Sequence, residues 1–261
     1  MTNTSSIIWT KTTMRNLKEK ISVENFIQKG STGKVYKARR DSDGKAVAVK
    51  MGTWVKSRSR FPPEILNLVR LRKCGVKGVN PILDYAIDES EKTYQVVFEQ
   101  KPMDLFDYVG EYKPPEPVAR DIIRQTLFHL CEMDEKAGLM HMDIKPENAL
   151  IDPDSIEVSL CDVENCIKTD KECVRIEYDI YTPDFIAPER INGRCFPRKS
   201  TVYSVGVMAY FLLHDNVPST NIVFSRSTSR AAAYFIMQCL DPNPVTRPTA
   251  QELLLTEWMT M

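Results

Sequence analysis

Apolar and polar residues alternate along much of the first hundred positions of the chain. The alternating runs lie at 21–28, 34–40 and 45–51 and are separated by short turns rich in glycine, serine and aspartate. A period of two is typical of strands, and such turns join antiparallel neighbours. Two more runs, at 79–87 and 93–99, also have the composition of strands. The pattern therefore predicts a small antiparallel sheet of five strands.

A helical spacing of apolar residues characterises the rest of the chain. It first occurs at 61–73 behind two prolines, which favour a helix N-terminus. A longer amphipathic stretch at 114–138 also begins at prolines and ends at glycine, a residue that commonly ends helices. Further helices are expected at about 200–214, 228–240 and 249–258, and short strands at 149–151 and 157–161.

The change of pattern at the polar stretch 99–104 predicts a bilobal domain of the α+β class. We expect an N-terminal extension at 1–20, a small antiparallel-sheet N-lobe at 21–101 and a mainly helical C-lobe at 102–261. A chain of 261 residues is long enough for two lobes that share a cleft.

Charge is balanced overall but uneven along the chain. Residues 1–60 hold 14 Lys and Arg against 4 Asp and Glu, whereas residues 131–190 hold 6 against 16. This distribution suits a cleft that binds phosphates on one wall and metal ions or basic ligands on the other. Two ordinary solvated faces explain it as well. No basic stripe is interleaved with aromatic residues, so nucleic acid is not an expected partner.

Cysteine usage and hydropathy bear on the compartment. The seven cysteines are scattered without a CxxC pair, which favours reduced thiols over a disulfide framework or a zinc site. The longest apolar run, 202–213, is too short to cross a bilayer, and the N-terminus lacks the apolar core of a signal peptide. We therefore expect an intracellular protein, cytoplasmic or nuclear, with no membrane partner.

Three features of the first hundred residues are candidates for phosphate binding. The turn Gly30-Ser31-Thr32-Gly33 can bring backbone N–H groups close to a polyphosphate, although an ordinary hairpin turn explains the same residues. Lys50 ends an apolar strand and can reach the same phosphates, or it can be a surface lysine. Glu64, in the next helix, can pair with Lys50.

A dense motif lies at 141–148, where the sequence reads His-Met-Asp-Ile-Lys-Pro-Glu-Asn. Asp162 follows a short strand further on, then come Ala187-Pro188-Glu189 and, much later, Arg247. Together with AVAVK ending at Lys50, this set resembles the eukaryotic protein-kinase family in order and spacing over nearly the whole chain. The segment DLFDYV at 104–109 is most similar to the PIM-type Ser/Thr kinases.

The resemblance implies a role for each residue of the motif. Asp143 would accept the proton of the substrate hydroxyl, and Lys145, typical of Ser/Thr kinases, would neutralise charge on the transferring phosphoryl group. Asn148 and Asp162 would coordinate Mg²⁺ or Mn²⁺, which prefer oxygen ligands. Glu189 and Arg247 would form a buried structural ion pair, and His141 would brace the catalytic loop.

The resemblance also implies an ATP site. Lys50 would hold the α- and β-phosphates with Glu64 as its ion-pair partner. Phe98 would be the gatekeeper at the back of the adenine pocket, and Val35 and Ala48 would pack against the adenine faces or serve simply as core residues. The residues expected to contact ATP are Gly30, Ser31, Thr32, Gly33, Val35, Ala48, Lys50, Phe98, Glu99, Asn148 and Asp162.

Four positions depart from the family pattern. Gln28 replaces the first glycine of the loop, which is expected to alter nucleotide affinity. Val163-Glu164 stands where the family has Phe-Gly, so a flexible residue is lost and a carboxylate is added near the metals. Thr201 replaces an aspartate that braces the catalytic loop, a loss that PIM-like kinases tolerate.

Met142, the fourth departure, replaces an arginine that usually binds a phosphate on the activation segment. We therefore expect activity without phosphorylation of Thr169, Tyr178, Tyr181 or Thr182.

The C-lobe is expected to be shortened. Only 72 residues follow Glu189, and the missing part is predicted between 214 and 228, where a substrate-docking helix usually lies. Such compaction is typical of virus-encoded kinases, so a viral protein acting in its host cell is one interpretation.

Substrates and an alternative function complete the expectations. Asp104, Asp107 and Glu147 predict a negative surface that binds Arg or Lys upstream of the phosphoacceptor. Alternatively, Asp104 simply caps the following helix. The enzyme hypothesis has one rival: because of Gln28 and Glu164, the chain can also be a pseudokinase or scaffold that binds a partner protein with or without ATP.

Overall fold

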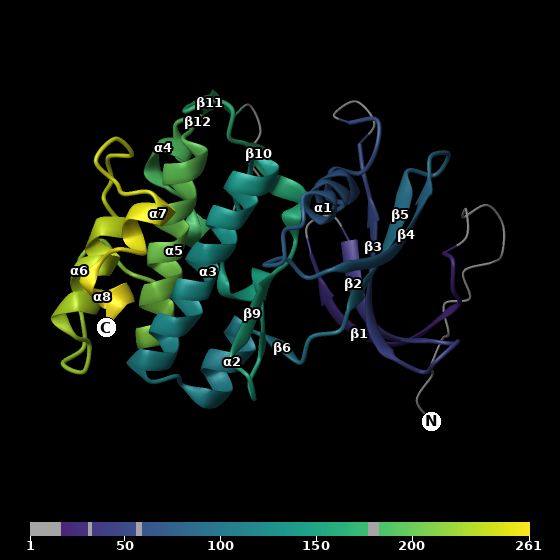
Figure 1. The fold of residues 1–261 in the computed structure, drawn as a ribbon, viewed down its shortest axis with the longest axis horizontal. Helices are drawn as coiled ribbons and strands as arrows, with labels where there is room; N and C mark the ends of the chain where they lie inside the picture. The colour runs from purple at the N-terminus through teal and green to yellow at the C-terminus, as the bar shows by residue number, and fades with distance from the viewer. Residues whose placement is uncertain (1–16, 31–32, 56–58, 177–182) are drawn as a thin grey trace. The chain divides into compact units, whose positions relative to one another are not determined.

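The computed structural model describes residues 17–30, 33–55, 59–176 and 183–261 (Figure 1). Ser31 and Thr32, predicted to contact phosphate, and Tyr178, Tyr181 and Thr182 of the activation segment lie outside the described residues. The chain forms two compact units. The first comprises the described residues up to Pro62 together with Ile82–Gln100, and the second comprises Pro63–Pro81 and Lys101–Met261.

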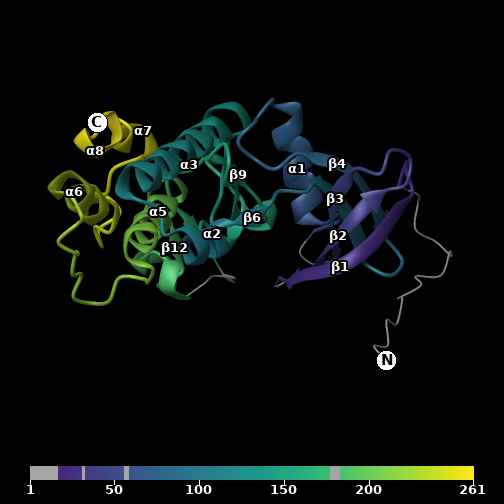
Figure 2. The same ribbon diagram turned by 90° about the horizontal axis from the view of Figure 1, so that it is seen from below.

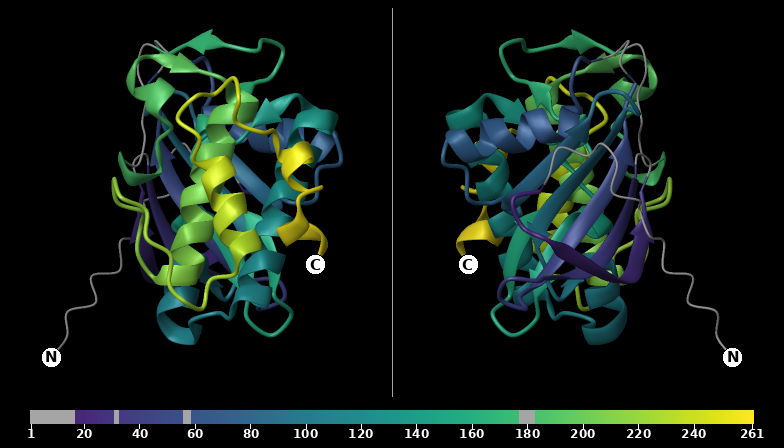
Figure 3. Two further views of the ribbon diagram at one scale, coloured as in Figure 1. Left: turned by 90° about the vertical axis from the view of Figure 1, so that its left-hand side faces the viewer. Right: turned by 90° about the vertical axis from the view of Figure 1, so that its right-hand side faces the viewer.

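The first unit is an antiparallel sheet with the strand order β1-β2-β3-β5-β4. Its strands are β1 (Ile21–Lys29), β2 (Gly33–Arg40), β3 (Ala46–Thr53), β4 (Ile82–Asp88) and β5 (Thr93–Glu99) (Figure 2; purple to blue in the right-hand view of Figure 3). All five strands match the alternating runs of the sequence. One face carries the apolar cluster Ala38, Val47, Val49 and Val97, with Leu17, Ile21 and Met51 packed against it.

The second unit is mainly helical. Its longer helices are α1 (Pro63–Lys73), α2 (Leu105–Tyr112), α3 (Glu116–Ala137), α5 (Pro197–His214) and α6 (Arg230–Cys239). Helices α3 and α5 pack against each other, as Figures 1 and 2 show. Most residues of α5 are buried, so this helix lies in the core of the unit. The short helices α4 (Pro188–Ile191), α7 (Ala250–Leu253) and α8 (Glu257–Thr260) complete the described helices.

Short strands hold the loops of the second unit. A three-stranded sheet contains β6 (Met103–Asp104), β8 (Ala149–Asp152) and β9 (Glu157–Leu160). Strand β7 (Leu139–Met140) pairs with β10 (Ile167–Lys168), and β11 (Val174–Arg175) pairs with β12 (Arg194–Cys195). The 3₁₀ turns η1 (Pro146–Asn148), η2 (Val163–Asn165) and η3 (Pro183–Phe185) connect them.

Most of the predicted helices are confirmed, and one detail was wrong. The helix that the capping interpretation of Asp104 implied is α2; Asp104 caps it by accepting a hydrogen bond from the backbone N–H of Asp107. The helix expected at 249–258 is two short helices, because the Thr256 hydroxyl donates to the Leu253 carbonyl and the chain turns there.

The predicted shortening of the C-terminal part is confirmed, because residues 215–229, all of them described, contain no helix. The predicted lobe boundaries at 21–101 and 102–261 stay a prediction; helix α1 groups with the second unit. No helix in the described part of the chain combines the length and the apolar character needed to cross a membrane.

Candidate active site

The segment 141–148 forms a loop between β7 and β8. Its first residue, His141, is buried and accepts a hydrogen bond at Nδ1 from the backbone N–H of Asp143, 3.2 Å away. The other ring nitrogen, Nε2, therefore carries the proton and donates to the Cys161 carbonyl at 2.8 Å. Burial lowers the pKa of the imidazole, and the bond to Cys161 only partly offsets this. His141 is thus a neutral brace between two parts of the site.

Asp143 is held by its neighbours within the loop. The Asn148 amide donates to the Asp143 carbonyl at 2.8 Å and to its carboxylate Oδ2 at 2.9 Å. The Lys145 ammonium lies 3.2 Å from the same Oδ2. A carboxylate held by an amide donor and a cation is fixed in position.

Asp162 lies next to this loop because β8 and β9 form a hairpin. The pairing of Ala149 with Leu160 continues in a hydrogen bond of 2.9 Å from the Cys161 N–H to the Asn148 carbonyl. Asp162 itself adopts a left-handed backbone conformation, with φ of 57°. Aspartate tolerates that region better than most residues, and such conformations occur often at functional sites.

Helix α1 holds the turn that follows Asp162. The Asn67 side-chain amide donates to the Val163 carbonyl at 2.8 Å and to the Glu164 carbonyl at 3.4 Å. Val163, which stands where the family has phenylalanine, is completely buried. A smaller apolar side chain therefore still anchors this turn in the core.

Three carboxylates converge at this turn. One oxygen from each of Glu64, Asp162 and Glu164 lies within 4.8 Å of the other two. Glu164 therefore does face Asp162, which the sequence left open. Carboxylate and amide oxygens are the donors that Mg²⁺ prefers, and the Asn148 amide nitrogen is already engaged with Asp143, which leaves its oxygen for a cation. The donor set fits a hard divalent cation.

Four of the predicted nucleotide-contacting residues, Val35, Ala48, Lys50 and Phe98, share one face of the sheet of the first unit. Val35 is paired with Lys50, and Ala48 is paired with Phe98. Paired residues of antiparallel strands point to the same face, as do Ala48 and Lys50, two residues apart on β3. Lys50 is only 6% exposed, so it is not a surface lysine. Glu99 pairs with Val47 and lies on the other face, and its contact with adenine stays a prediction.

The glycine turn has a structural requirement of its own. A Cβ atom on Gly33 would lie 2.4 Å from the Met51 carbonyl oxygen, so β3 approaches too closely for any other residue. Gly30 donates its N–H to the Gly33 carbonyl at 2.8 Å. The close approach of β3 thus explains the glycine at position 33, and phosphate binding by this turn stays a prediction.

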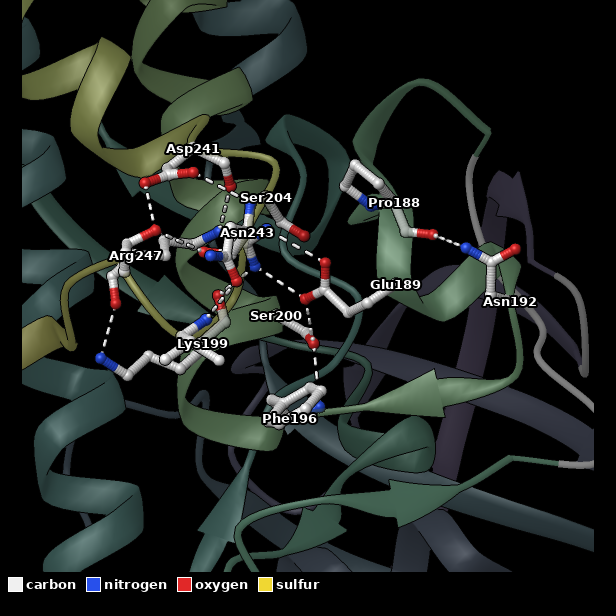
Figure 4. Close-up of polar contacts among 12 residues, drawn as sticks. Pro188, Glu189, Asn192, Phe196, Lys199, Ser200, Ser204, Asp241, Asn243 and Arg247 are labelled. Atoms are coloured by element: carbon white, nitrogen blue, oxygen red, sulfur yellow. Dashed lines mark hydrogen bonds and ion pairs between the residues drawn. The ribbon is translucent and has the colours of Figure 1, made fainter.

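The buried ion pair predicted between Glu189 and Arg247 is confirmed. Two hydrogen bonds, of 2.7 and 3.0 Å, join the guanidinium to the carboxylate, and the Ser200 hydroxyl donates to the same carboxylate at 2.7 Å (Figure 4). Burial favours a raised pKa for Glu189, but the bonds from Arg247 and Ser200 outweigh it and the pKa is lowered. The pair anchors α4 to α5 and to the segment before α7.

Thr169 of the activation segment is not exposed as an accessible phosphorylation site would be. Its side chain is buried, and its hydroxyl donates to Asp134 at 2.6 Å. Arg198 binds the same Asp134 carboxylate through two nitrogens. Phosphorylation of Thr169 would have to break this cluster.

An acidic group lies at the start of α2. Burial raises the pKa of the Asp104 carboxyl, and the charges of Asp107 and Glu147 raise it further against the opposing backbone hydrogen bond from Asp107. The charges of Asp107 and Glu147 therefore both act on Asp104. The Oε2 oxygen of Glu147 is buried and lacks a hydrogen-bond partner among the described residues.

Comparison with known proteins identifies the class to which this architecture belongs. The protein kinase domain family matches residues 21–259, and the chain belongs to that family. The predicted α+β protein-kinase fold is confirmed.

Individual relatives are kinases at modest identity, and one of them is named a serine/threonine-protein kinase. The chain is 27% identical to the serine/threonine-protein kinase pim-2 of Danio rerio over 285 residues, which covers 97% of this chain and 89% of that protein. It is 27% identical to CBL-interacting protein kinase 2 of Oryza sativa subsp. japonica and 29% identical to the hormonally up-regulated neu tumor-associated kinase of Mus musculus, covering 93% and 88% of this chain. The alignments span only 58% and 35% of those two proteins.

Two residues of the site escaped the sequence reasoning. Asn67 lies one helical turn after Glu64, on the same face of α1, and this spacing was the available signal. Arg190, which follows Glu189, donates to the Met142 carbonyl at 2.6 Å. Nothing in the sequence indicated that contact, because it joins positions 48 residues apart.

Proposed function

We propose that this protein is a serine/threonine protein kinase that transfers the γ-phosphoryl group of ATP to hydroxyl groups of protein substrates. Asp143 accepts the proton of the attacking Ser or Thr hydroxyl while the hydroxyl oxygen of the substrate bonds to the γ-phosphorus. The bond between the γ-phosphorus and the bridging oxygen breaks, and ADP leaves. Lys145 balances charge on the transferring group.

The observation that carries this proposal is the arrangement around Asp143. Its carboxylate is bound by Asn148 and Lys145, and the hairpin places Asp162 beside Asn148. Phosphoryl transfer depends mainly on positioning and on charge stabilisation, and these residues supply both. The proposal includes Lys50 as the phosphate-binding lysine and Glu64 as its partner, as the family implies.

Asn148 and Asp162 are the proposed ligands of Mg²⁺ or Mn²⁺. A bound divalent cation would neutralise charge on the phosphates and orient them. Glu164 adds a carboxylate to this neighbourhood, so the local negative charge exceeds that of the family pattern.

A preference for substrates with upstream Arg or Lys is part of the proposal. The acidic group of Asp104, Asp107 and Glu147 supports it, since a basic side chain would neutralise the three charges. A peptide library should show basic selection that weakens in Glu147→Gln and persists in Glu157→Gln, an exposed control; a library without basic selection would remove this part.

Independence from activation-segment phosphorylation is also proposed. Met142 is apolar and buried, so the catalytic loop offers no arginine to a phosphate at this position, and the Thr169 hydroxyl is already engaged. Phosphatase-treated protein should keep its full rate. A rate that vanished on dephosphorylation would refute this part.

The central test is phosphoryl transfer with Mg²⁺ or Mn²⁺ by the wild type, Asp143→Asn and the exposed control Asp154→Asn. The wild type and the control should be active, and Asp143→Asn should lose activity by about 100- to 10,000-fold. Equal background in all three would instead favour the scaffold function, for which the crowded Glu164 carboxylate is the supporting observation.

An intracellular location is also proposed. The seven cysteines, none of which forms a disulfide, support it.

A further inference from the structure

The carbonyl oxygens of the three consecutive residues 141–143 each accept a side-chain hydrogen bond from a different element. The Thr201 hydroxyl of α5 donates to the first at 2.7 Å, and the Arg190 guanidinium of α4 donates to the second at 2.6 Å. The Asn148 amide of η1 donates to the third at 2.8 Å. The backbone that carries Asp143 is therefore fixed peptide by peptide.

Arg190 is the least expected of these donors. It is only 3% exposed, so its guanidinium has exchanged water for protein. A charged donor to a carbonyl forms a stronger hydrogen bond than a neutral one, and a buried charge is costly unless it is well bonded.

The position of Arg190 in the chain couples two regions. It belongs to α4, directly after Glu189, whose carboxylate is fixed by Arg247 and Ser200. Its guanidinium ends on the carbonyl of Met142, the residue before Asp143. The Arg190 side chain therefore joins the end of the activation segment to the catalytic loop.

We propose that Arg190 is a positioning residue that holds the catalytic loop in its active geometry, in place of a contact made by a phosphorylated activation segment. The loop residue that would otherwise bind a phosphate is Met142, which is 2% exposed and cannot do so. Here the positive charge lies on the segment that follows the activation segment, at Arg190, and it binds the carbonyl of Met142 in the loop. This contact needs no phosphorylation. This inference rests on the proposed kinase function.

The consequence for catalysis follows from geometry. The Met142 carbonyl belongs to the peptide that precedes the Asp143 Cα atom, so freeing it lets the Asp143 carboxylate move relative to the substrate hydroxyl. A displacement of about 1 Å can lower a rate on the order of 100-fold. The residues proposed to hold the nucleotide are not touched, so the KM for ATP should stay nearly constant.

The experiment compares Arg190→Met, Arg190→Lys and Thr201→Val with Arg226→Met, a control at an exposed arginine. In the full chain, kcat and the KM for ATP are measured with a peptide substrate after phosphatase treatment. Hydrogen exchange of the amides of 141–144 is measured in parallel. These amides report whether the loop itself loosens.

Arg190→Met should lower kcat by roughly 30- to 100-fold with a KM for ATP within about threefold of the wild type. Arg190→Lys, which keeps a donor, should recover part of the loss, and Thr201→Val should lose about three- to tenfold because a neutral bond is weaker. Exchange should rise at 141–144 and stay unchanged in the sheet of the first unit. Arg226→Met should match the wild type.

Three results would overturn the proposal: a kcat for Arg190→Met equal to that of Arg226→Met, equal proportional changes of kcat and KM, or exchange that rises uniformly throughout the protein. If Arg190→Met does not fold, Arg190→Lys and Thr201→Val are judged by the same criteria. If the wild type shows no transfer that depends on Asp143, the kinase proposal fails, and the exchange data alone still decide whether Arg190 holds the loop.

Discussion

The catalytic loop at 141–148 and the turn at 162–165 lie side by side. Hydrogen-bond donors neutralise the polar groups of the loop backbone, whereas negative charges gather at the turn. In the loop, backbone carbonyls are matched by donors from Thr201, Arg190 and Asn148. In the turn, the carboxylates of Asp162 and Glu164 lie within 4.8 Å of each other and of Glu64. Like charges at this separation raise the free energy of the turn unless positive charge lies beside them.

This difference indicates which part of the site is held by hydrogen bonds within the protein and which part is stabilised by a bound cation. The backbone at 141–143 needs nothing beyond the fold, since each of its three carbonyls already has a donor. The turn is held in place by Asn67, but its charge favours a bound cation. The loop should therefore respond to loss of hydrogen bonds, and the turn should respond to changes of charge and of metal concentration.

The largest effect is expected from removing the charge of Asp162. Asp162→Asn should lower the rate of phosphoryl transfer on the order of 1,000-fold, because a metal ligand at the phosphates is lost. The stability should change little or rise, since repulsion within the turn falls. Steady-state kinetics and thermal unfolding check this, with Asp154→Asn as the exposed control. A variant that kept its rate would contradict the assignment of Asp162.

Breaking the buried ion pair between Glu189 and Arg247 should lower the free energy of unfolding. Arg247 is completely buried, and Arg247→Met leaves the Glu189 carboxylate without its ionic partner. Denaturant unfolding should show a loss of about 3–5 kcal/mol. Arg39→Met, which breaks the exposed pair with Glu24, should cost less than about 1 kcal/mol. Equal losses in the two variants would show that the buried anchor is not special.

The loop should also be sensitive to acid through His141. Its pKa is lowered in the folded protein, so the unfolded state binds the extra proton first as the pH falls. Stability from this group is present above about pH 6.5 and is lost below it, by up to about 1.4 kcal/mol per pH unit. His141→Gln, which offers similar hydrogen bonds, should reduce that slope. His129, whose pKa burial also lowers, contributes equally to both proteins. Identical slopes would exclude His141 as the source.

The smallest effect is expected from Glu164→Gln. Two unit charges about 4 Å apart repel by about 1 kcal/mol in a water-like medium. Unfolding in EDTA should therefore show a gain of that order, and the added stabilisation by Mg²⁺ should shrink. Matching curves for the variant and the wild type, with and without Mg²⁺, would mean that the turn does not sense this charge.

The sequence predicted what depends on local pattern and missed what depends on distant contacts. The sheet strands and α3 follow from periodicity, and Asp104 was recognised as a possible helix cap before α2 itself was identified. The ion pair of Glu189 with Arg247 came from the family resemblance. By contrast, the roles of Arg190 and Asn67 depend on backbone carbonyls that are distant in the sequence, so the helices that contain these residues do not indicate them. The split of the last helix at Thr256 reflects a local hydroxyl bond that periodicity does not register.

The most direct test of the account is a crystal structure of the protein with Mn²⁺ and a non-hydrolysable ATP analogue. The account predicts anomalous density for manganese within coordination distance of an Asn148 oxygen and an Asp162 oxygen, with the analogue's phosphates at Lys50. Manganese and triphosphate bound elsewhere, or Asn148 and Asp162 turned away from the metal, would contradict it.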